Sequence, residues 1–77
     1  MGTLTHIDEK AYGQLLRRAL PHVIRDEDEY ERLANELLRL DELEAPSPEE
    51  KEISELLTVL IDEYEGRRFP IRAASPA

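Results

Sequence analysis

The segment 45–50, with the sequence APSPEE, constrains the fold more than any other part of this chain. Pro46 rules out a continuous helix, because proline lacks the backbone N–H that a helix interior needs and its ring clashes with the preceding turn. Ser47 fits the N-cap of a new helix, Pro48 fits its first position, and Glu50 completes a capping box with the serine. The segment therefore predicts that one helix ends before Pro46 and that another begins at Pro48.

Apolar side chains recur every three or four residues on both sides of this break, which is the spacing of one helix face. They are Tyr30, Leu33, Leu37 and Leu40, flanked by Ala34 and Leu38, before the break, and Ile53, Leu57, Leu60 and Tyr64, flanked by Leu56 and Ile61, after it. Helices joined by a short connection usually lie antiparallel. We therefore expect helices over about 27–43 and 48–65, packed as an antiparallel hairpin, with Gly66 ending the second one.

A shorter helix is predicted before the hairpin, over about residues 8–20. Its apolar residues keep helical spacing, and Pro21 ends it. Gly13 weakens it, because glycine inside a helix costs up to ~1 kcal/mol against alanine. Residues 22–25 then form a short connector, and Asp26 begins the next helix.

The expected fold class is therefore all-α, with three helices and an extended C-terminal tail. Residues 1–72 are expected to form a single helical module, and residues 73–77 a linker or a disordered end. A domain of this size buries only about 60 % of the surface that its unfolded chain exposes, so such chains often gain stability from a partner.

Charge is unevenly distributed along the chain. Ten basic and eighteen acidic side chains give a net charge of −8, but residues 26–65 alone hold sixteen acids and three bases, a net charge of −13. Such a segment repels phosphate, so we expect no nucleic acid and no anionic membrane as partner of this segment. It favours a basic protein, although a solvated helix face that keeps the protein soluble has the same composition. No apolar run is long enough for a membrane span and the N-terminus does not resemble a signal peptide, so a cytoplasmic location is expected.

The residues that could carry chemistry do not match the patterns of di-metal sites, calcium loops, phosphate loops or catalytic nucleophiles. His6 and His22 lack the glutamate three residues earlier that helical di-metal sites use. A calcium loop beginning at Asp26 would have Glu31 at its sixth position, where glycine is needed. The chain has no cysteine, no glycine-rich phosphate loop and no serine paired with a histidine. We therefore expect no catalytic, cofactor-binding or metal site, and a protein that is not an enzyme.

Apolar surface is left over after the hairpin is packed. Val59 lies well outside the apolar face of its helix, and Leu43 falls at the edge of the preceding one. Surplus apolar surface on a small module usually marks a dimer or a protein-binding face, although single exposed apolar residues are also common. We expect Leu43 and Val59 to be exposed partner contacts, Phe69 and Ile71 to anchor the tail, and Tyr64 to join the last helix to that tail.

A resemblance to a known family covers about residues 12–76. Its motifs are Leu20-Pro21, Ile24, Glu27 and Glu29-Tyr30-Glu31, then Pro48-Glu49-Glu50, Ile53, Leu56-Leu57, Leu60-Ile61, Tyr64-Glu65 and Arg68-Phe69-Pro70-Ile71, and finally Ala74-Ser75-Pro76. This pattern resembles the N-terminal helical region of HigA-type antitoxins, in which a helix-turn-helix half follows. The resemblance implies a toxin–antitoxin system, a basic mRNA-cleaving toxin of the HigB or RelE type as partner, and repression of the antitoxin's own operon. The helix-turn-helix half is absent from these 77 residues, so DNA binding is not carried over to any of them.

The sequence therefore favours a protein-interaction module of a HigA-like regulator that forms a homodimer, binds a cationic toxin, or does both. Two alternatives remain open at this point. One is a purely structural dimerisation module, and the other is an acidic DNA mimic that inhibits a nucleic-acid-binding protein. A DNA mimic would bind with a steep dependence on salt and little apolar contribution.

Overall fold

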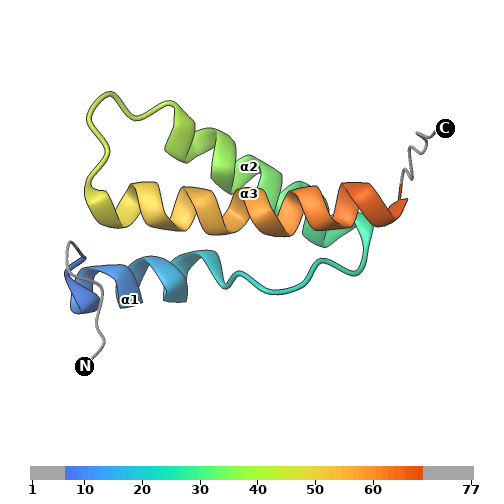
Figure 1. Cartoon of the computed structure of the whole chain (residues 1–77), viewed down its shortest axis with the longest axis horizontal. Coiled ribbons are helices and arrows are strands. Elements are labelled where there is room, and N and C mark those ends of the chain that lie inside the picture. Colours follow the sequence, from blue (N-terminus) through green and yellow to red (C-terminus); the bar gives the residue numbers. More distant parts are fainter. Residues whose placement is uncertain (1–6, 69–77) are drawn as a thin grey trace, which may run out of the picture.

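The computed structural model describes residues 7–68, which form three helices and no strand (Figure 1). α1 spans Glu9–Ala19, α2 spans Glu27–Asp41 and α3 spans Pro48–Arg68. α3 lies in the middle, and both α1 and α2 pack against it. α2 and α3 run in opposite directions, so the all-α fold class and the antiparallel hairpin are confirmed.

Side-chain caps fix where α2 and α3 begin. Ser47 and Glu50 form the predicted capping box, in which Glu50 N donates to Ser47 Oγ at 3.1 Å and Ser47 N donates to Glu50 Oε1 at 2.8 Å. Asp26 caps α2 by accepting a hydrogen bond from Glu29 N at 2.8 Å. Each cap satisfies a backbone N–H that has no partner inside its own helix. Both helices therefore begin where the sequence predicts.

α1 begins with Asp8 as its N-cap, which accepts hydrogen bonds from Lys10 N at 3.0 Å and Ala11 N at 3.3 Å. The backbone N of Asp8 in turn donates to Glu49 Oε2 at 2.6 Å. This contact ties the start of α1 to the start of α3, and the two helices run in the same direction (Figure 1). The connector of residues 20–26 then continues beside α3 to the point where α2 begins.

The helix ends agree with the prediction to within two residues except at the C-terminus of α3. The prediction that Gly66 ends α3 is wrong, because the helix continues to Arg68. The arginines of the last turn contact side chains one turn earlier: Arg67 Nε donates to Glu63 Oε2 at 2.5 Å, and Arg68 Nη1 donates to the Tyr64 hydroxyl at 2.8 Å. These contacts stabilise one more helical turn than the glycine signal predicts. The expected tail over 69–77 lies outside the described residues.

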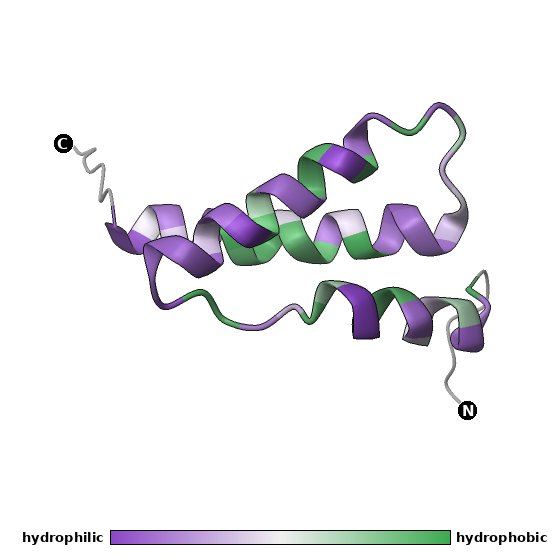
Figure 2. Ribbon diagram, turned by 180° about the vertical axis from the view of Figure 1, so that it is seen from behind, coloured by the Kyte–Doolittle hydropathy of each residue, from purple (hydrophilic) through white to green (hydrophobic). Residues whose placement is uncertain are grey.

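The buried core draws on all three helices and on the connector. Its members are Ala19, Ile24, Leu33, Leu40, Ile53, Leu57, Ile61 and Tyr64. Figure 2 shows apolar stretches on α2 and α3 where these helices cross, and further apolar stretches in the connector. Burying one large aliphatic side chain stabilises a fold by about 1.5–3 kcal/mol, so this small set accounts for much of the stability.

The connector is part of the core, which the sequence did not predict. Ile24 is 0 % exposed. Arg67 Nη2 donates to the Ile24 carbonyl at 2.7 Å, and Arg32 donates to the carbonyls of Ala19 at 2.7 Å and Leu20 at 3.0 Å. These bonds satisfy backbone oxygens at the end of α1 and in the connector, which no helical hydrogen bond would satisfy. The connector is therefore fixed against the helices.

Candidate protein-binding surface

Many carboxylates of this acidic chain stabilise the fold. Glu36 lies between Arg39 of its own helix, at 2.6 Å, and Arg18 of α1, at 3.3 Å. The hydrogen bond from Arg39 lowers the pKa of Glu36 and the one from Arg18 lowers it further, while burial opposes the shift. The other carboxylates paired with side chains are Glu27 with Arg68, Glu29 with Arg32 and His22, Glu63 with Arg67, and Glu65 with Tyr30. The charges of these carboxylates are therefore engaged in contacts within the molecule.

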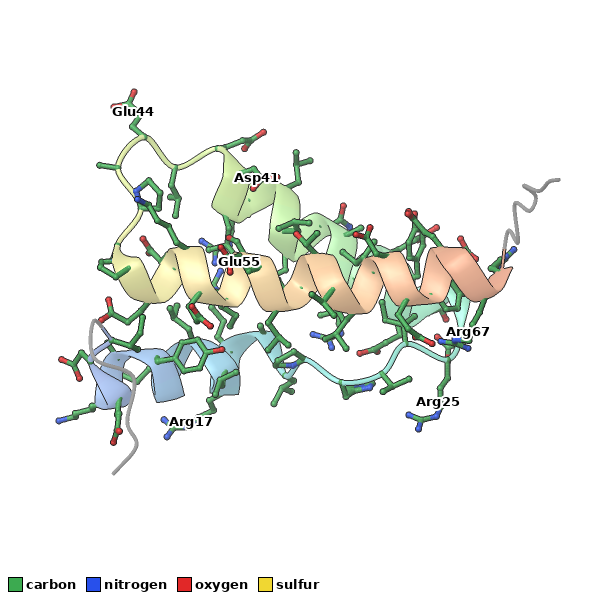
Figure 3. The ribbon with its side chains drawn as sticks, viewed as in Figure 1. Arg17, Arg25, Asp41, Glu44, Glu55 and Arg67 are labelled. Atoms are coloured by element: carbon green, nitrogen blue, oxygen red, sulfur yellow. The ribbon has the colours of Figure 1, made fainter. Side chains whose placement is uncertain are left out.

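A second set of carboxylates on α2, the following loop and α3 is exposed and has no hydrogen-bond or ion-pair partner within residues 7–68. These are Asp28, Glu31, Asp41, Glu42, Glu44, Glu55 and Asp62. Figure 3 shows Asp41 and Glu44 at the edge of the molecule opposite Arg17 and Arg25, with Glu55 on α3 between the two edges. Because no cation pairs with these acids within residues 7–68, they attract a basic surface from solution.

Five of the exposed positions follow one face of α2 and its C-cap, which we term the α2 outer stripe. It consists of Asp28, Glu31, Asn35, Leu38 and Glu42, spaced by alternating steps of three and four. Such steps place the residues above one another along a helix. Leu38 is 57 % exposed and is the one apolar member of this stripe.

α3 carries a similar row, which we term the α3 outer stripe. It consists of Lys51, Glu55, Val59 and Asp62, all exposed and all spaced by three or four residues. Val59 is 63 % exposed, and the acids one turn before it and one turn after it have no partner among the described residues. Each stripe therefore combines one solvent-exposed aliphatic side chain with neighbouring uncompensated acids.

This arrangement offers the two features that protein contacts use, exposed apolar side chains and charges beside them. Covering an exposed aliphatic side chain with a partner is favourable, and the charges beside it influence which partner binds. Among residues 7–68, no group of three or more histidine, aspartate or glutamate side chains is arranged to hold a metal ion. No helix in that range combines the length and apolar character that crossing a bilayer requires.

Two of the predicted contact residues differ in their surroundings. Val59 is exposed, as the sequence predicts. Leu43 was expected to be exposed, but it is half-buried and packs against the core. The chain turns after α2, where Leu43 N donates to the Leu40 carbonyl at 3.2 Å. This turn returns the side chain to the core, so the expectation of an exposed Leu43 is wrong.

Tyr64 is buried and takes part in packing at the C-terminal end of α3. Its ring centre lies 5.2 Å from that of Tyr30, and the Arg67 guanidinium lies 5.5 Å from its ring centre. A buried ring is not accessible to a partner protein. Its predicted role in joining α3 to the tail, and the predicted anchors Phe69 and Ile71, involve the tail, which lies outside the described residues.

The exposed apolar residues Leu20, Val23 and Leu38 were missed by the sequence analysis. Leu38 was placed at the margin of the apolar face of α2, and its exposure arises because α1 packs mainly against α3 and leaves that margin of α2 uncovered. Leu20 was expected inside the first helix, on its apolar face, but it lies at the C-cap of α1 in a left-handed conformation. Val23 belongs to the connector, where no helical period indicates which side chain faces inward. The connector holds two adjacent apolar residues, Val23 and Ile24, and its sequence gives no signal of which one is buried.

Comparison with protein-family models, curated proteins and solved structures gives no match for this chain.

Proposed function

We propose that this chain is a protein-interaction module that binds a basic protein through the α2 and α3 outer stripes. The observation that carries this proposal is the pairing, in each stripe, of an exposed aliphatic side chain with acids that have no partner within residues 7–68. Interfaces of this kind use a few apolar contacts for affinity and the surrounding charges for steering and selection.

The specific form of this proposal is an antitoxin-like module whose partner is a small cationic RNase of the HigB or RelE type. Its support is the resemblance of the quoted motifs to HigA-type antitoxins, together with the net charge of −13 over residues 26–65. We also propose that the chain associates with a second copy of itself, as regulators of that type do. Binding to the toxin and self-association are separate activities and are tested separately.

Titration calorimetry of the chain with the product of the neighbouring gene tests the toxin-binding proposal. We expect heat release and co-elution on gel filtration. Glu55→Lys should weaken binding, whereas Glu9→Lys, which makes the same change in net charge on α1, should leave it nearly unchanged. Absence of both heat and co-elution would overturn the proposed partner.

The exposed aliphatic residues separate this proposal from the DNA-mimic alternative. If Leu38 and Val59 are covered by the partner, Leu38→Ala and Val59→Ala should each weaken binding by about 1 kcal/mol even at high salt. A DNA mimic that acts through charge alone predicts no effect of either substitution and nearly complete loss of binding as salt rises. Binding that is insensitive to both substitutions would therefore favour the mimic.

A further inference from the structure

The edge of the molecule formed by α1 and the connector carries a surface of the opposite sign to the outer stripes. It consists of Arg17, Leu20, Val23 and Arg25, all exposed, and we term it the basic edge. Leu20 is 60 % exposed and Val23 is 43 % exposed. Figure 3 shows Arg17 and Arg25 projecting from this same edge, away from α3. Arg17 has no partner within residues 7–68.

Leu20 has a backbone conformation that does not suit its side chain. It follows the last turn of α1 with φ 47° and ψ 56°, in the left-handed region, and its N–H donates to the Leu16 carbonyl at 2.7 Å. This position in a helix C-cap is usually glycine, because a Cβ atom is disfavoured there. The leucine side chain is mostly exposed, so little burial offsets this strain within one chain. An exposed leucine in this strained conformation is suited to a contact with a second molecule.

We propose that the basic edge of one copy covers the α3 outer stripe of a second copy in a two-fold symmetric dimer. This inference deepens the self-association proposed above and rests on it. Leu20 and Val23 would contact Val59, while Arg17 and Arg25 would pair with Glu55 and Asp62. The occupant is a second copy because the chain itself displays a surface of matching charge with an aliphatic residue at its centre.

A two-fold symmetric dimer would use these two surfaces reciprocally. In such a dimer one self-complementary surface is used twice, so that each patch of one copy meets the other patch of its partner. The elements that carry the two surfaces are neighbours, because α1 packs against α3, and Arg67 of α3 binds the connector carbonyl of Ile24. The contact closes after two copies. It covers the α3 outer stripe, so a basic protein that binds there competes with the second copy, whereas the α2 outer stripe stays open.

Sedimentation equilibrium of the full chain at high micromolar concentration tests the dimer, and Leu20→Gly is the decisive variant. Glycine removes the exposed side chain and relieves the left-handed strain. We expect the dimer to dissociate about tenfold more readily, as for loss of one apolar contact, while the thermal unfolding midpoint of the dilute protein stays the same or rises. If Leu20 served only the fold of one chain, the midpoint would fall and dimerisation would not change.

A charge exchange tests the pairing itself. Arg17→Glu and Glu55→Arg should each weaken the dimer, and the double variant should restore much of the lost affinity. Leu38→Ala, which removes an exposed leucine from the α2 outer stripe, is the control and should leave dimerisation unchanged. A strict monomer, a dimer weakened by Leu38→Ala instead of Leu20→Gly, or no rescue by the double variant would each overturn the proposal. Because these measurements use the chain alone, they do not depend on whether the toxin-binding proposal holds.

Discussion

Arg67 donates a hydrogen bond from Nη2 to the backbone carbonyl of Ile24 at 2.7 Å, and so connects the last turn of α3 to the segment between α1 and α2. The same guanidinium donates to Glu63, from Nε at 2.5 Å and from Nη2 at 2.9 Å. One side chain therefore stabilises the end of a helix and also satisfies a backbone oxygen of the connector, forty-three residues earlier in the chain.

Arg67→Ala should lower the free energy of unfolding by more than Arg17→Ala does, because a charged donor to the part-buried Ile24 carbonyl is lost. Urea denaturation followed by circular dichroism measures this change. Arg17→Ala makes the same change in net charge at a position without a partner among residues 7–68, so it should alter the free energy of unfolding by less than about 0.5 kcal/mol. Equal effects of the two substitutions would show that only net charge matters.

Ile24→Ala should be far more destabilising than Val23→Ala, although the two residues are adjacent. Ile24 is fully buried, and truncating a buried isoleucine to alanine costs about 2–5 kcal/mol. Val23 is largely exposed, so its truncation should have a small effect on the free energy of unfolding. Chemical denaturation of both variants provides the comparison. Similar values would contradict the placement of the connector against the core.

The contrast between Ser47 and Ile24 shows what the sequence can reveal about this fold. The capping box is formed by residues three apart, so its chemistry is local and predicts the start of α3 correctly. The burial of Ile24 depends on Arg67 and on helices elsewhere in the sequence, and an extended connector has no helical period to report it. Gly66 is a local stop signal that was overridden for the same reason, because Arg67 and Arg68 also bind the Ile24 carbonyl and Glu27, more than forty residues earlier in the chain.

Ser47→Ala should destabilise the protein by about 1 kcal/mol, since the N-cap hydroxyl that accepts from Glu50 N is lost. Ser54 is the matched control, because it lies in the interior of α3. Ser54→Ala should leave stability unchanged or raise it slightly, as alanine has the higher helix propensity. Thermal unfolding followed by circular dichroism distinguishes the two, and an equal loss in both variants would argue against the cap.

Stability should fall in acid, and Glu36 should contribute to that fall. Arg39 and then Arg18 hold the pKa of Glu36 below its ordinary value of 4.5. A lowered pKa in the folded state stabilises the protein above the unfolded pKa, and this contribution is lost as pH falls through the folded value. The free energy of unfolding of Glu36→Gln should therefore depend less steeply on pH below about 4.5 than that of the parent chain. Glu31→Gln, which removes a carboxyl without a partner within the described residues, should retain the parent's slope.

The candidate surface was less predictable than the fold. The exposure of Val59 follows from the period of one helix, so the sequence indicates it. The exposure of Leu38 and the half-burial of Leu43 depend on which margin of α2 its neighbours cover and on a turn after the helix. Composition reveals the acidic excess, but it does not separate acids such as Glu36, which pair with arginines, from those such as Glu55, which have no partner within residues 7–68.

Tyr30→Phe should lower the free energy of unfolding, because the Tyr30 hydroxyl donates to Glu65 Oε2 at 2.5 Å across the interface of α2 and α3. This hydrogen bond is the main cause that raises the pKa of Tyr30 above its ordinary value of 10.0. A raised folded pKa means that the stabilisation is fully present below the unfolded value and is lost as pH rises through the folded one. The stability difference between the parent and Tyr30→Phe should therefore be constant near neutral pH and shrink in alkali.

Tyr12→Phe is the control, because no hydrogen bond links the Tyr12 hydroxyl to another described residue. Denaturant unfolding at neutral pH should show a larger loss of unfolding free energy for Tyr30→Phe than for Tyr12→Phe. The opposite order would show that the Tyr30–Glu65 hydrogen bond does not stabilise the hairpin.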